Sequence, residues 1–197
     1  ISGALTVDGG TIKLDGNYPT GTGNVALGDT ALGSGSLSGG NNVAVGRQAL
    51  CSNTSATCNT SIGDRTLCTN TTGANNTAVG SFALCVNTTG AGNTAVGKDS
   101  LISNTTGGTN TAVGLCSLNA NTTADNNTAV GRGALKLNTT GASNVGVGRN
   151  ALEANTTGAS NVGLGFESLK TNTTASNNTA VGLCSMALNT TGTLNVA

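Results

Sequence analysis

The chain has 197 residues, of which 31 are glycine, and its eight basic and eight acidic residues cancel to a formal net charge of zero. It has no histidine and only three aromatic residues, so it lacks the basic stripe and the stacking platforms of a nucleic-acid-binding protein. No run of about 18 apolar residues predicts a membrane span. The apolar supply, mostly Ala, Val and Leu, suits a thin core rather than a globular one.

The first 23 residues stand outside the pattern that fills the rest of the chain. Apolar residues alternate on both sides of Asp8-Gly9-Gly10, which is typical of a β-hairpin. We expect residues 1–23 to form a hairpin cap or connector and residues 24–197 to form a separate repeat domain. Because the chain starts without methionine and stops inside a repeat at Ala197, we expect it to be a processed product or part of a longer protein.

From residue 24 onward one pattern recurs, with a first step of 18 residues and later steps of 17. In the copy around Gly80 its fixed points are Asn76, Val79, Gly80 and Leu84, followed by an Asn-Thr-Thr turn that begins at Asn87. A disordered linker has no reason to keep such columns, so the spacing indicates stacked structural units. The repeat glycines are Gly28, Gly46, Gly63, Gly80, Gly97, Gly114, Gly131, Gly148, Gly165 and Gly182.

Each unit contains two short apolar segments, Thr-Ala-Val and an Ala-Leu pair, separated by Gly and Asn. Both are too short for helices, and we expect two short strands joined by tight turns, with Val79 and Leu84 pointing inward. No unit can bury its apolar residues alone, but stacked units share a continuous core. The sequence therefore predicts an all-β parallel β-solenoid of ten to eleven rungs, a rod roughly 48 Å long.

The two asparagine columns have two compatible interpretations. Asparagine favours tight turns, and stacked asparagines can also form a ladder of side-chain amides from rung to rung. The Asn-Thr-Thr triplets in addition match the acceptor sequence for N-glycosylation, although we favour their role in the turn. These possible glycosylation sites are Asn70, Asn87, Asn104, Asn121, Asn138, Asn155, Asn172 and Asn189.

Four of the six cysteines are candidates for one or two disulfides. Cys51, Cys68 and Cys85 share the column five residues after the glycine, and stacked neighbours would lie about 4.8 Å apart, within disulfide range. Cys58 lies on the turn between the first two. A zinc site is the competing interpretation, but the chain contains no Cys-x-x-Cys pair.

Catalytic chemistry is not indicated. Histidine, the commonest general base, is missing, and the carboxylates follow no column of the repeat. The Gly-Gly-x-Gly-x-Asp repeat of calcium-binding β-rolls is also missing. We therefore expect no enzyme activity, no cofactor and no metal.

The segment Asn41-Asn42-Val43-Ala44-Val45-Gly46 resembles the head repeat of trimeric autotransporter adhesins, and the longer pattern also looks like repeats of bacteriophage tail fibres. The resemblance covers residues 24–197. It implies a left-handed β-roll, three chains side by side and a role in attachment. Most copies here have Thr where the head motif has its first Val, and the unit is longer.

We accordingly expect an extracellular structural or adhesive fibre segment, displayed on a cell surface or a virion and binding a host-surface or matrix ligand. Its partners would be further copies of itself, as a homotrimer or filament. A phage or virus tail-fibre shaft is the alternative. A less favoured one is an ice-binding solenoid, with Thr71-Thr72, Thr88-Thr89 and Thr105-Thr106 in ranks. The residues after each glycine, such as Lys98-Asp99, vary most; they either form a recognition surface or, as we favour, drift as exposed positions.

Overall fold

The computed structural model describes residues 23–34 and 37–197, so the hairpin expected over residues 1–23 lies almost wholly outside the described residues. Within these ranges the only regular elements are strands of three residues, one in each repeat. They are β1 (Val25–Leu27), β2 (Val43–Val45), β3 (Thr60–Ile62), β4 (Thr77–Val79), β5 (Thr94–Val96), β6 (Thr111–Val113), β7 (Thr128–Val130), β8 (Val145–Val147), β9 (Val162–Leu164) and β10 (Thr179–Val181).

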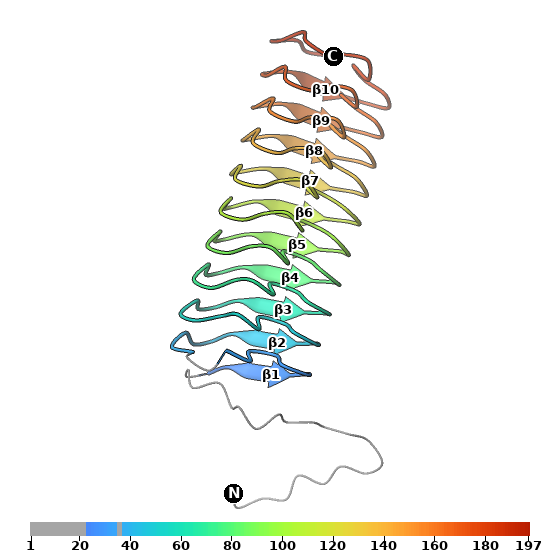
Figure 1. Cartoon of the computed structure of the whole chain (residues 1–197). Coiled ribbons are helices and arrows are strands. Elements are labelled where there is room, and N and C mark those ends of the chain that lie inside the picture. Colours follow the sequence, from blue (N-terminus) through green and yellow to red (C-terminus); the bar gives the residue numbers. More distant parts are fainter. Residues whose placement is uncertain (1–22, 35–36) are drawn as a thin grey trace, which may run out of the picture.

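The ten strands form one parallel sheet in which each strand pairs with the next along the chain. The register joins equivalent positions, so that Thr77 pairs with Thr94 and Val79 with Val96. A bridge between Thr179 and Val196 begins a further rung. Figure 1 shows the result, a rod in which every turn of the chain lies on the one before it. The predicted parallel β-solenoid is confirmed.

The glycine after each strand is required by the contact between rungs. Gly80 has a φ of 120°, a region that other residues avoid. A Cβ built at this position would lie 2.8 Å from the carbonyl carbon of Gly97 in the next rung. The column therefore stays glycine because the backbones of neighbouring rungs touch there.

The Ala-Leu segment forms no second strand, so the prediction of two strands in each rung was wrong. Leu84 lies in a turn with a φ of 51°, in the left-handed region. Its N–H donates to the oxygen of Ser100 at 3.0 Å, and its side chain is fully buried. Burying a leucine contributes about 1.5–3 kcal/mol, which offsets the left-handed cost of about 1–2 kcal/mol.

The strands present their valines outward, which contradicts the expected inward direction of Val79. The middle residue, Ala78, is the one that is fully buried. The interior has room only for a small residue here, because the leucines of the turn fill it from the other side. At Gly146, a Cβ would already lie 3.3 Å from the Cγ of Leu135. The core is therefore one column of leucines packed against columns of alanine.

The two asparagine columns lie inside the rod and form the ladders that the sequence suggested. Asn76 donates its backbone N–H to Oδ1 of Asn59 at 2.9 Å, and Asn87 donates Nδ2–H to Oδ1 of Asn70 at 2.8 Å. Both Asn76 and Asn87 also donate Nδ2–H to the oxygen of Gly90, each at 2.9 Å. Turn formation and rung-to-rung bonding are thus performed by the same side chains.

Candidate functional site

Charged side chains gather on one side of the rod, which we call the post-strand edge: the positions one, two and five residues after each repeat glycine. Of the charged residues in the described part, Asp125 alone lies elsewhere. The edge also contains Phe82 and Phe166. Its charged members are Asp29, Arg47, Asp64, Arg65, Lys98, Asp99, Arg132, Lys136, Arg149, Glu153, Glu167 and Lys170.

The sequence analysis saw that these positions vary but missed that they hold nearly all of the charge. Writing the chain in rows of 17 residues would have shown it, because the charges then fall into three columns. The physical reason is solvation: this edge turns away from the core, and an unpaired charge inside the narrow rod would be costly. The other faces consist of uncharged, repeated residues.

Several charges of the edge are paired. Arg47 donates from Nη2 to Oδ2 of Asp64 at 2.9 Å in the next rung. Lys170 donates from Nζ to Oε1 of Glu167 at 2.8 Å, which lowers the pKa of Glu167 and raises the pKa of Lys170. Arg65 donates to Oε1 of Gln48 at 2.8 Å and lies 5.9 Å from the ring centre of Phe82.

Three predicted disulfide partners lie in one stack on this edge. The Sγ atoms of Cys51 and Cys68 are 3.2 Å apart, and all six cysteines are thiols in this structure. Burial, together with the hydrogen bond to Cys51, raises the pKa of Cys68 to about 12. Burial also raises the pKa of Cys85. A bridge within this stack stays a prediction.

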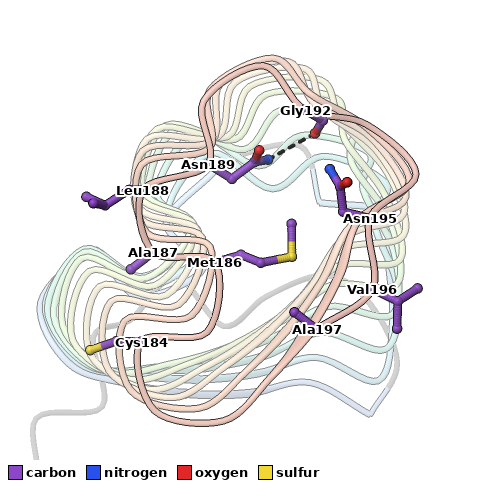
Figure 2. Close-up of a pocket in the computed structure, with 9 residues that line it drawn as sticks. All are labelled: Cys184, Met186, Ala187, Leu188, Asn189, Gly192, Asn195, Val196 and Ala197. Atoms are coloured by element: carbon purple, nitrogen blue, oxygen red, sulfur yellow. Dashed lines mark hydrogen bonds between the residues drawn. The ribbon is translucent and has the colours of Figure 1, made fainter.

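Cys58 is not brought to that stack. It is exposed and precedes Asn59, a member of the interior asparagine column. Figure 2 shows the two sides of the rung: Ala187 stands at the position of the cysteine stack, and Asn195, in the column that follows Cys58, lies across the interior. Disulfide formation with Cys58 would therefore require pairing outside its own rung stack.

The possible glycosylation sites lie inside the rod, with the exception of the half-buried Asn189 near the end. In Asn87 the amide nitrogen that would carry a glycan already donates to Asn70 and Gly90. Attachment to a folded rung would break these bonds. The structure thus supports the turn role that the sequence analysis favoured, and glycosylation itself stays a prediction.

The threonine ranks named in the sequence analysis are only partly available to a ligand. Thr71, Thr88 and Thr105 each donate the hydroxyl to a backbone oxygen in the next rung, at 3.1, 3.1 and 3.0 Å. Thr72 and Thr89 beside them are exposed. A second rank lies on the outer face of the sheet, where Thr60, Thr77, Thr94, Thr111 and Thr128 follow one another directly.

A hollow of about 890 Å³ lies at the end of the rung stack (Figure 2). Met186 points into it, whereas Leu188 and Val196 point outward. Its lining contains no charged side chain. It is the uncovered interior of the last rung, and the arrangement offers no acid–base chemistry.

Two searches of residues 23–34 and 37–197 gave no site. They contain no group of three or more Cys, Asp or Glu side chains placed to hold a metal ion. No helix long and apolar enough to cross a membrane occurs in the same residues. Compared with known proteins, the chain matches no family model, no curated protein and no solved structure.

Proposed function

We propose that the chain is a non-enzymatic segment of an extracellular fibre, the shaft or head of a surface adhesin that mediates attachment. The observation that carries this proposal is the uninterrupted in-register stack of ten strands. Such a stack has a length set by the number of repeats, and every rung is bonded to the next through backbone and asparagine amides. These are the properties of a stiff spacer.

The shaft of a bacteriophage or viral tail fibre is the alternative within this proposal, with a virion rather than a cell as its location. Both alternatives use a rod that presents a variable surface to the outside. The post-strand edge supports this part of the proposal, because variation and charge are confined to it while the interior columns hardly change.

The partner in the fibre is further copies of the same chain, side by side. The outer face of the sheet is uncharged, and its aliphatic column is partly exposed, at 40% for Ile62 and 36% for Val96 and Val130. Covering this column would remove apolar surface from water at roughly 25 cal/mol per Å². Three chains in a left-handed roll is the arrangement that the resemblance to autotransporter heads implies.

Light scattering on the purified chain under non-reducing conditions tests the assembly. The proposal predicts a mass of three times 18.9 kDa. Replacing Val96 and Val130 with lysine places charges in the aliphatic column and should give monomers, whereas lysine at the exposed Thr89 should leave the trimer intact. A monomeric unmodified chain would contradict side-by-side assembly.

Ice binding is a second candidate, favoured by one observation. Five consecutive threonines on the outer sheet face, from Thr60 to Thr128, stand in register beside the aliphatic column. Thermal hysteresis that disappears when Thr94 is replaced with lysine would support this function. Its absence at high protein concentration would exclude it and leave the fibre proposal untouched.

A further inference from the structure

Three cations of the post-strand edge stand apart from the others because they have no ionic partner. Arg47, Lys98 and Lys170 each lie within 4.0 Å of a carboxylate, and Arg65 bonds to Gln48. Among the described residues, the remaining three form no ion pair. They are Arg132, Lys136 and Arg149.

These three cations line one hollow of about 150 Å³, together with Glu153 and Asn150. Arg132 and Arg149 occupy the same column of adjacent rungs, since Asn150 N–H donates to the oxygen of Arg132 at 3.0 Å. Stacked rungs are about 4.8 Å apart, and like charges in directly opposed positions are destabilising. With one carboxylate against three cations, the hollow has a local charge of about +2, which no neighbouring group neutralises.

The hollow exists because of Gly133. In the other described rungs the position two residues after the glycine carries a side chain: Thr30, Gln48, Arg65, Phe82, Asp99, Cys116, Asn150, Glu167 or Cys184. Gly133 has a φ of 68°, and a Cβ placed on it would lie 2.6 Å from Oδ1 of Asn150. The missing side chain opens the space between the two arginines and Lys136.

We propose that this hollow is a binding site for an acidic saccharide, whose carboxylate or sulfate group is held between Arg132, Lys136 and Arg149. Guanidinium groups bind such oxyanions through paired N–H donors, and a lysine adds a point charge. Glu153 and the Oδ1 atom of Asn150 are acceptors, and they suit hydroxyl groups next to the anion. The site belongs to a single chain and does not depend on the fibre proposal.

Binding of two acidic polymers, polygalacturonate with carboxylates and dextran sulfate with sulfate esters, tests the site, with neutral dextran as the blank. Titration calorimetry of the full chain should detect at least one of them, and the polymer that binds identifies the anion. R132Q and R149Q should each weaken binding about tenfold, because each removes a charge-assisted hydrogen bond. K98Q is the matched control: it removes one positive charge from the same column, and we expect a change of less than twofold.

A second variant separates the hollow from simple electrostatic attraction. G133N keeps every charge, fills the hollow and uses a residue that tolerates a positive φ. It should weaken binding at least tenfold while melting at the temperature of the unmodified chain. The proposal is overturned if neither polymer binds, if K98Q weakens binding as much as R132Q, or if G133N binds like the unmodified chain.

Discussion

Asn76 and Asn87 satisfy hydrogen-bonding groups that stacked rungs would otherwise bury without partners. The oxygen of Gly90 accepts from both amides, and each asparagine also bonds to its equivalent in a neighbouring rung. A narrow rod cannot admit water to these groups, so the asparagines replace it. This requirement, and not the turn alone, explains why both columns keep asparagine.

Replacing Asn87 with alanine should therefore destabilise the fold strongly. The change removes the donor to Oδ1 of Asn70 and the acceptor of Asn104 Nδ2–H, and it leaves buried groups without partners. We expect a loss of about 2–4 kcal/mol in the free energy of unfolding, measured by urea titration. Thr89→Ala, in the same turn but exposed, should change it by less than about 0.5 kcal/mol. Equal effects of the two substitutions would refute the ladder as a source of stability.

The thiols of the cysteine stack should differ in reactivity from the exposed ones. Alkylation proceeds through the thiolate, and a pKa of about 12 leaves Cys68 protonated at pH 8.5. Because this folded-state pKa is raised, its contribution to stability is present below the unfolded pKa and is lost as the pH rises toward 12. Iodoacetamide followed by peptide mass analysis should label Cys58 and Cys184 well before Cys68 in the folded chain, and all three at similar rates in urea. Rapid labelling of folded Cys68 would contradict the assigned environment.

At the scale of the element, a strand of three residues decides what faces the core by its middle position. In β4 that residue is Ala78, and the flanking Thr77 and Val79 face outward. The opposite wall is built from leucines in left-handed turns, such as Leu84. Each rung thus pairs one extended wall with one wall of turns.

Substitutions at neighbouring positions in β4 should separate the inner wall from the outer face. Ala78→Val adds volume to a filled interior and should cost about 1–3 kcal/mol in the free energy of unfolding. Val79→Thr exchanges one side chain for another of similar shape at a half-exposed position and should cost less than about 0.5 kcal/mol. Thermal melts of the two variants make the comparison, and the reverse order would mean that valine faces the core.

The repeat glycine sets the closest approach of two rungs. Gly80→Ala would combine a forbidden φ with a Cβ 2.8 Å from the backbone of Gly97. We expect a loss of about 3 kcal/mol or more, seen as a lower midpoint in urea. Gly92→Asn provides the control, because Gly92 has a φ of 70° and an open neighbourhood. A wild-type midpoint for Gly80→Ala would show that the rungs are further apart than described.

The sequence was sufficient for the columns but not for the direction of their side chains. Equal spacing of Asn76, Gly80 and Leu84 predicted stacked rungs, because only stacking makes identical environments at a fixed step. Three residues are too few for alternation to distinguish inside from outside, and hydrophobicity pointed to Val79 rather than Ala78. The left-handed turn at Leu84 was also beyond prediction, since leucine disfavours it and only the bonds between rungs compensate.

On the scale of the whole molecule, the rod is a one-dimensional object in which each rung contacts only its neighbours (Figure 1). Its stability is then close to a sum of rung and interface contributions, and its length follows the number of rungs. The charged edge and the outer face of the sheet are separate, so that a side-by-side assembly can cover the face and leave the hollow at Gly133 open. This separation connects the fold with the proposed fibre.

The most direct test of the rung stack is to lengthen it and measure the shape in solution. A second copy of residues 132–182, inserted after Gly182, adds three repeats without adding a cysteine. Small-angle X-ray scattering should show a particle longer by ~14 Å with an unchanged cross-sectional radius of gyration. An increase in the cross-section at constant length would contradict the stack of single-strand rungs.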